Sequence, residues 1–102
     1  MIVVVATVEL RPGARERFLA ELAALAPVVL RETGCIEYWP TVDVASGLGA
    51  QVPLRSDVVT IVEKWESLPA LAAHAVAPHM QAYRLRVVDL VAKTALQVLA
   101  PQ

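Results

Sequence analysis

Two histidines are the residues in this chain that are best suited to chemistry. His74 follows Leu71 by one helical turn on an apolar stripe, so its side chain should point toward the interior. An imidazole titrates near neutral pH, which makes His74 a candidate base that removes a proton from a substrate. The alternative is a structural role, in which a buried His74 holds a helix to a strand through Glu63. His79 follows Pro78 at a helix start, where it either contributes to the site or caps the helix in solvent.

Glu63 and Trp65 are two residues apart in a β-branched segment, so they share one face of a predicted strand. If that face meets the helices, Trp65 forms a wall of a pocket and Glu63 is a buried carboxylate that needs a partner. His74 or Arg84 could be that partner. The alternative is a packed tryptophan beside an ion pair at the end of the sheet. We take His74, Glu63 and Trp65 as the candidate catalytic residues.

Two tyrosines complete the set of candidate polar groups. Tyr38 and Tyr83 could each offer a hydroxyl to a substrate oxygen, or could belong to the core with a solvated tip. The candidate substrate-binding residues are therefore Tyr38, His79, Tyr83 and Arg84.

The sequence predicts no metal site. His74 and His79 are five residues apart across a predicted helix break, which is not the i, i+4 spacing of a helical metal site. Cys35 is the only cysteine, so there is no cysteine cluster to bind a metal and no intrachain disulfide. Cys35 has no basic neighbour to lower its pKa, and we interpret it as a small apolar residue of the core.

The elements that must position these groups can be read from the spacing of apolar residues. The pattern predicts, in chain order, a strand at 2–10, a helix at 14–32, strands at 35–44 and 57–65, a helix from Ser67 that is broken at Pro78 and resumes at 79–91, and a strand at 94–99. Pro27 should kink or break the first helix near Ala23, and Pro40 suggests an edge strand or a bulge. Gly34 suits the left-handed position after a helix.

This order of elements is the β-α-β-β-α-β arrangement of a ferredoxin-like, split βαβ fold, in one α+β domain spanning residues 1–102. It places an antiparallel sheet against helices on one face only. Val3 and Val5 alternate with Val4, Ala6 and Val8, so the second face of the sheet also carries apolar residues. A second copy of the chain would cover that face, and we expect a homodimeric α+β barrel.

Composition excludes several classes of protein. Hydrophobic residues make up 57% of the 102 residues, charged residues 19%, and the net charge is -1. The chain therefore lacks the basic surface of a nucleic-acid-binding protein and is too apolar to be disordered. Its apolar runs are too short to cross a membrane, and its first residues do not have the pattern of a signal peptide. We expect a cytoplasmic protein.

Four segments resemble the antibiotic biosynthesis monooxygenase family, which includes quinol monooxygenases. They are IVVVA with RPG near the start, ETGCIEY at 32–38, EKW at 63–65 followed by Leu68, Leu71 and His74, and APHMQA at 77–82. Thr33, Ala77 and Met80 replace the proline, serine and phenylalanine that are usual in the family. The resemblance extends from Ile2 to about Asp89.

The resemblance implies a dimeric ferredoxin-like barrel that oxygenates an electron-rich phenol, quinol or anthrone without metal or flavin. Such a substrate must lose a proton to become an anion that passes an electron to O2. The protein then needs only an apolar pocket, a base and donors that stabilise the anion. Haem degradation, known among relatives of this fold, is disfavoured because Thr7 and Arg84 occupy the places of the asparagine and the histidine ligand of those enzymes.

Two other functions remain open from the sequence. The same pocket and base could serve an isomerase or another proton-transfer enzyme acting on a small carbonyl compound, which would consume no oxygen. The chain could also be a non-catalytic dimer that carries a ligand. A further departure from the family is the segment 43–57, which is longer than usual and could cover the pocket, lengthen the strands or extend the dimer contact.

Overall fold

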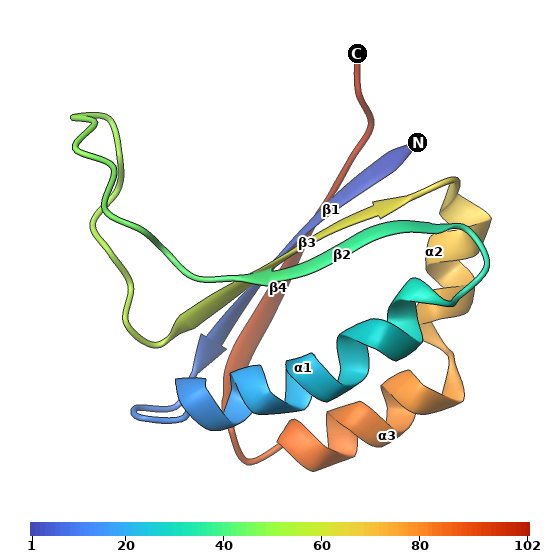
Figure 1. Ribbon diagram of the computed structural model, residues 1–102, viewed down its shortest axis with the longest axis horizontal. Coiled ribbons are helices and arrows are strands. Elements are labelled where there is room, and N and C mark those ends of the chain that lie inside the picture. Colours follow the sequence, from blue (N-terminus) through green and yellow to red (C-terminus); the bar gives the residue numbers. More distant parts are fainter.

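The predicted order of elements is confirmed by the computed structural model, which describes residues 1–102. The elements are β1 (Ile2–Leu10), α1 (Arg15–Leu30), β2 (Cys35–Thr41), β3 (Val58–Trp65), α2 (Leu68–Ala75), α3 (Pro78–Val87) and β4 (Val91–Leu99). The strands form one antiparallel sheet in the order β2-β3-β1-β4, and the helices lie on one side of it (Figure 1). This is the expected ferredoxin-like α+β fold.

Alternation along the strands decides which residues meet the helices. On β1 the side chains of Val4, Ala6 and Val8 are buried, and on β3 those of Val59, Ile61, Glu63 and Trp65 are buried. On the helix side of the core, α1 contributes the apolar stripe Phe18, Leu22, Leu25 and Val29, and α3 contributes Met80, Tyr83 and Val87. The core thus lies between the sheet and the pair α1 and α3.

Helix α1 and the ends of several other elements differ from the sequence prediction. Helix α1 continues through Pro27, because Pro27 and the Ala23 carbonyl that loses its hydrogen bond lie on the exposed face, where water can replace the bond. Helix α3 ends at Val87 and β4 begins at Val91, three residues earlier than expected, because Val91 already pairs with Leu10 beyond an irregularity in β1. Strand β2 ends at Thr41.

Local signals in the sequence are confirmed at three turns. Gly34 adopts a positive φ of 84° after α1. The Ser67 side chain accepts a hydrogen bond from the Ala70 backbone N–H and caps α2. Strand β2, which contains Pro40, is an edge strand, as one of the two expectations for that proline stated; Pro40 itself pairs in regular register with Ile61, and the only shift in this pair of strands lies between Cys35 and Glu37.

The segment between β2 and β3 projects away from the helices beyond one end of the sheet (Figure 1). Arg55 and Asp43 close its base through a bidentate pair with N–O distances of 2.9 Å. No residue of 42–57 lines the cavity described below, and neither strand extends into this segment. Within one chain it therefore neither covers the pocket nor lengthens the strands.

The face of the sheet opposite the helices has an apolar centre, which Val3 and Leu99 extend into the neighbouring row. One row of paired residues carries Trp39, Val62, Val5 and Gln97 across the sheet. The neighbouring rows carry threonines on one side and the Lys64–Glu37 ion pair on the other. Val5 and Val62 remain half-buried in one chain, whereas Trp39 is 58% exposed. We call this side, centred on Trp39, Val62 and Val5, the open sheet face.

Candidate active site

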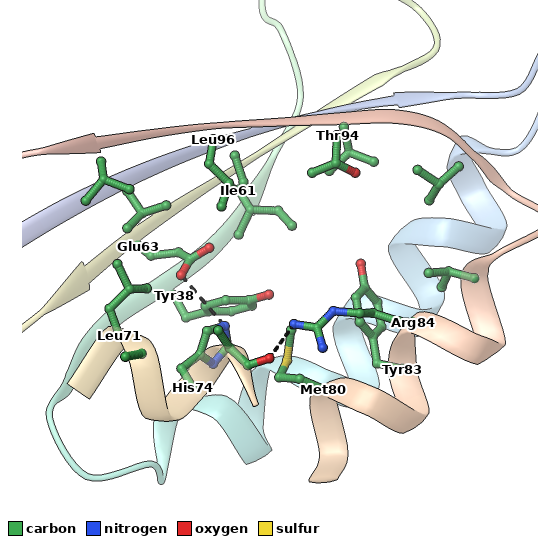
Figure 2. Close-up of a pocket in the computed structure, with 18 of the residues that line it drawn as sticks. Tyr38, Ile61, Glu63, Leu71, His74, Met80, Tyr83, Arg84, Thr94 and Leu96 are labelled. Atoms are coloured by element: carbon green, nitrogen blue, oxygen red, sulfur yellow. Dashed lines mark hydrogen bonds and ion pairs between the residues drawn. The ribbon is translucent and has the colours of Figure 1, made fainter. Parts of the chain in front are cut away.

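A cavity of about 860 Å³ lies between the sheet and helices α2 and α3. Twenty residues line it, and sixteen of them are hydrophobic. The four polar ones are Glu63, His74, Arg84 and Thr94 (Figure 2). Several apolar lining residues remain exposed, namely Leu68, Val88, Leu96 and Val98. The cavity therefore opens between β4 and the helices, and its polar groups lie on an otherwise apolar wall.

His74 lies at the wall of this cavity, in the last turn of α2, and its side chain is almost completely buried. Its ring packs on the indole of Trp65 with a centroid distance of 4.6 Å and on the Tyr38 ring at 5.9 Å. The prediction that His74 points inward is confirmed. A catalytic base and a purely structural histidine would both occupy this position, so the hydrogen-bond partners of His74 must distinguish between the two roles.

The two ring nitrogens of His74 face different groups. Nδ1 lies 2.8 Å from Glu32 Oε2, and Nε2 lies 3.9 Å from Glu63 Oε1, which is beyond hydrogen-bond distance. An ionised carboxylate can only accept, so Nδ1 carries the proton of the neutral ring and donates it to Glu32. Nε2 then has a free lone pair on the side of Glu63 and the cavity.

Of the two partners expected for Glu63, His74 lies within ion-pair distance, whereas the hydrogen bond to the carboxylate comes from Trp65. The indole Nε1–H of Trp65 donates to Glu63 Oε1 at 2.9 Å, and both residues are buried on the same face of β3. Burial raises the pKa of the Glu63 carboxyl above its ordinary value, while the Trp65 hydrogen bond and His74 oppose the increase. The shared strand face predicted for Glu63 and Trp65 is confirmed.

Trp65 is not a wall of the cavity, contrary to the prediction. Its side chain is fully buried and it is absent from the cavity lining, because the tilted ring of His74 packs against it on that side. Trp65 therefore touches the site through other residues, by supporting the imidazole of His74 and holding the carboxylate of Glu63.

Tyr38 and Tyr83 both line the cavity as expected. Their rings are buried, but neither hydroxyl has a hydrogen-bond partner within the chain, and both hydroxyls point into the cavity (Figure 2). Burial raises the pKa of both hydroxyls above the usual tyrosine value, so both retain their proton at neutral pH. The cavity thus contains two free phenolic donors.

Arg84 also lines the cavity, but it does not pair with Glu63. Its guanidinium Nη2 donates to the Ala75 carbonyl at 2.7 Å, which ties α3 to the last turn of α2 (Figure 2). This bond uses one of the five N–H donors of the guanidinium. The others remain available at the cavity wall, next to the phenol of Tyr83.

His79 and Glu32 lie behind His74 and outside the cavity lining. The Nε2 atom of His79 is 2.8 Å from the same Glu32 Oε2 that His74 approaches. The structure thus brings His79 to His74 through Glu32, but it does not place His79 at the cavity surface as a substrate-binding residue. Sequence reasoning missed Glu32, although it begins the ETGCIEY segment that was singled out for its resemblance to a family.

Comparison with known proteins gives a consistent family. A family model described as antibiotic biosynthesis monooxygenase matches residues 1–86. The chain is 38% identical over 103 residues to "Probable quinol monooxygenase YgiN" of Escherichia coli strain K12, an alignment that covers 99% of this chain and 98% of that one.

Solved structures share the fold. The structure of Rv0793 from Mycobacterium tuberculosis is 28% identical with a TM-score of 0.80, and the match covers 99% of this chain and 94% of that one. The protein SO0527 from Shewanella oneidensis is 31% identical with a TM-score of 0.77, covering 96% and 87% of the two chains. In addition, no helix of the chain is long and apolar enough to span a membrane.

Proposed function

Because the chain belongs to the antibiotic biosynthesis monooxygenase family, we propose that it is a cofactor-independent monooxygenase that oxidises a small electron-rich aromatic with O2. A quinol, a phenol or an anthrone would have the required chemistry. A relative named a probable quinol monooxygenase, aligned over almost the whole chain, supports this class of substrate. The placement of His74 carries the proposal, with one ring nitrogen fixed by Glu32 and the other directed toward an apolar cavity.

The cavity suits such a substrate in size and polarity. A volume of about 860 Å³ lies within the range of pockets that bind small organic ligands, and sixteen of its twenty lining residues are hydrophobic. Apolar walls favour a flat aromatic ring and keep water away from a reactive anion. The few polar groups then orient the substrate hydroxyl toward His74.

His74 is the proposed base. Its Nε2 accepts the proton of a substrate hydroxyl, while Glu32 holds the ring through Nδ1 and stabilises the imidazolium that forms. Glu63 lies 3.9 Å from Nε2, where its ionised form also favours the positive ring. Trp65 fixes Glu63 and supports the ring of His74, so its proposed part is that of a positioning residue.

The substrate anion needs donors at its oxygen. The hydroxyls of Tyr38 and Tyr83 are unpaired and protonated, and the guanidinium of Arg84 supplies a positive charge on the same wall. The anion passes an electron to O2, and the resulting radical pair recombines to a peroxide, in which a new C–O bond has formed. The peroxide takes up the proton held by His74, and loss of water then breaks the O–O bond and the C–H bond at the same carbon. One oxygen atom remains as a carbonyl, and the substrate supplies all four electrons.

Oxygen uptake tests the proposal against a panel of quinols and anthrones. We expect substrate-dependent consumption of O2, and a loss of at least about 100-fold in kcat/KM for His74→Ala, which is the contribution typical of a positioned base. Arg86→Gln is the matched control, since Arg86 lies on the surface of α3 and pairs with Glu21 outside the cavity.

Two results would overturn the proposal. Turnover of a carbonyl compound without oxygen uptake would favour an isomerase that uses the same base. A His74→Ala protein that retains full activity would exclude His74 as the base. Circular dichroism of each variant shows whether a loss of activity reflects a loss of fold.

We also propose that two copies of the chain pair through the open sheet face. In one chain Trp39 is largely exposed there, and the hydroxyl of Thr60 on the same face is buried without a hydrogen-bond partner. Strand β4 is an unpaired edge of the sheet, and its residues on the open sheet face, Ala95, Gln97 and Leu99, are also exposed.

Light scattering after gel filtration tests the dimer at micromolar concentration. We expect twice the mass of one chain for the native protein and the mass of a single chain for Val62→Asp, since a carboxylate at the centre of the face opposes its burial. Leu85→Asp places the same charge on an exposed position of α3 and should leave the dimer intact. A native monomer, or a dimeric Val62→Asp, would contradict this mode of association.

A further inference from the structure

We propose that Glu32, His74 and His79 bind a divalent transition-metal ion, on the side of His74 that faces away from the cavity. The three side chains each offer one ligand atom, and these atoms all lie within 4.8 Å of one another. Neither Glu32 nor His79 lines the cavity, so His74 is the one residue that this site shares with the substrate pocket. The proposal concerns metal binding alone and does not depend on the proposed reaction.

The geometry of the cluster is that of two imidazoles converging on one carboxylate oxygen. His74 Nδ1 and His79 Nε2 both lie 2.8 Å from Glu32 Oε2. Two histidines and one carboxylate form a common donor set for transition metals, and zinc enzymes use the same set with water in the remaining position. The second carboxylate oxygen of Glu32 has no hydrogen-bond partner in the chain and could also reach the ion.

Binding of an ion requires the three ligand atoms to rearrange. Metal–ligand bonds of about 2.0–2.2 Å in a tetrahedral arrangement place neighbouring ligand atoms roughly 3.3 Å apart. Both imidazole nitrogens now lie 2.8 Å from Glu32 Oε2, so each N–O distance would increase by about half an ångström, and the two rings would turn from Oε2 toward the ion. The present contacts are the hydrogen bonds that the cluster makes when the ion is absent.

Three different elements hold the ligands in place. Glu32 lies in the turn after α1, His74 in the last turn of α2, and His79 in the first turn of α3. The side chains of His74 and Glu32 are 7% and 13% exposed, and that of His79 is 28% exposed. The ligands are therefore enclosed, and His79 marks the side from which an ion can enter from solvent.

The donor set also selects the class of ion. Imidazole nitrogens favour Zn²⁺, Co²⁺, Ni²⁺ and Cu²⁺ over Mg²⁺ and Ca²⁺, which prefer oxygen ligands. The N-terminal end of α3 disfavours a cation near His79, and the negative charge of Glu32 compensates for it. With only three protein ligands, the site should keep at least one position for water.

A bound ion would change what His74 can do at the cavity. The ion takes the Nδ1 lone pair, so the neutral ring carries its hydrogen on Nε2 and has no free pair there. His74 would then donate toward the cavity and could no longer accept a proton from a substrate. This consequence, inhibition by the metal, rests on the proposed function, whereas the site itself does not.

Direct titration tests the site without any substrate. Tag-free, EDTA-treated protein is titrated with Zn²⁺ by calorimetry and with Co²⁺ by its visible spectrum. The chain contains two histidines and one cysteine, so background binding is low. We expect one ion per chain, and an affinity more than about tenfold weaker for His79→Gln and Glu32→Gln, since even changes around metal ligands cost that much.

Glu21→Gln is the matched control, because Glu21 is a partly exposed carboxylate of α1 that pairs with Arg86. It should bind Zn²⁺ like the native protein. His79→Gln decides the test alone if Glu32→Gln does not fold, since His79 is the most exposed of the three ligands. Equal affinity in His79→Gln and the native protein would overturn the proposal, and so would the absence of Zn²⁺ binding at micromolar concentration.

Anomalous scattering from a crystal soaked in Zn²⁺ then locates the ion. A peak between Glu32, His74 and His79 supports the site, and a peak elsewhere overturns it. Failure of the oxygenase proposal would leave this outcome untouched, because neither measurement involves turnover.

Discussion

Replacement of Gly34 by alanine should destabilise the protein far more than the same change at Gly13. Both glycines have a positive φ, 84° and 78°, which costs an alanine about 1–2 kcal/mol. A Cβ at Gly13 would meet no atom within 4 Å, whereas one at Gly34 would lie 2.6 Å from the Cβ of Ala70. Ala70 Cβ is fixed to the backbone of α2 and cannot rotate away, so overpacking adds about 1–3 kcal/mol.

The expected loss for Gly34→Ala is therefore about 2–5 kcal/mol, against about 1–2 kcal/mol for Gly13→Ala. Urea unfolding followed by tryptophan fluorescence gives both values, at one chain concentration because association also contributes to stability. Ala70→Gly supplies a rescue. It costs about 1 kcal/mol by itself, but it removes the contacted atom, so Gly34→Ala in that background should cost only the backbone term.

The double-mutant cycle decides whether the steric argument is correct. A coupling energy of about 1–3 kcal/mol between Gly34→Ala and Ala70→Gly is expected. Additive effects, or a Gly34→Ala protein as stable as Gly13→Ala, would refute the close approach of this turn to α2. The same turn carries Glu32 and the same helix carries His74, so a shift here should also alter the site.

Two further changes test the surroundings of the site. Trp65→Phe removes the indole N–H that donates a hydrogen bond to Glu63. It should lower the free energy of unfolding by about 1.5–3 kcal/mol near pH 7, measured by urea titration. An unchanged stability would show that this hydrogen bond contributes nothing. Burial, aided by the carboxylates of Glu32 and Glu63, raises the pKa of the Cys35 thiol from 9.0 to about 11. The fraction of Cys35 present as thiolate at pH 8 then falls to about 1 in 1,000, so iodoacetamide should react with it roughly 100-fold more slowly than with a peptide cysteine. The reaction rate should increase with pH up to about pH 11. A rate that becomes constant below pH 9 would contradict the raised pKa.

Local patterns in the sequence were sufficient to predict the fold. Alternation from Val59 to Trp65 placed Glu63 and Trp65 on one face of a strand, and the structure shows that this face meets the helices. Gly34 and Ser67 marked the two turns that their backbone chemistry requires. The break considered at Pro27 does not occur, because a proline on the solvent side of a helix leaves a carbonyl to water and the helix continues.

The site was predicted only in part, because contacts between distant elements decide it. The candidate residues His74, Glu63, Tyr38, Tyr83 and Arg84 all line the cavity, as their types and their positions on strands and helices suggested. The contact between the rings of His74 and Trp65 joins a helix to a strand, so neither the helical spacing around His74 nor the strand alternation around Trp65 predicts it. This contact covers Trp65 and removes it from the cavity wall. Glu32 lies 42 residues before His74, and no periodicity relates the two.

The break between α2 and α3 explains how two histidines five residues apart reach one carboxylate. In a continuous helix they would project about 140° apart, so one of them would turn away from Glu32. Pro78 forces Ala77 into an extended conformation, with φ -60° and ψ 141°, and the chain turns before α3 starts. His79 thereby returns toward the end of α2. The proline that interrupts the helix is thus what allows His74 to face the cavity with one nitrogen while the other shares Glu32 with His79.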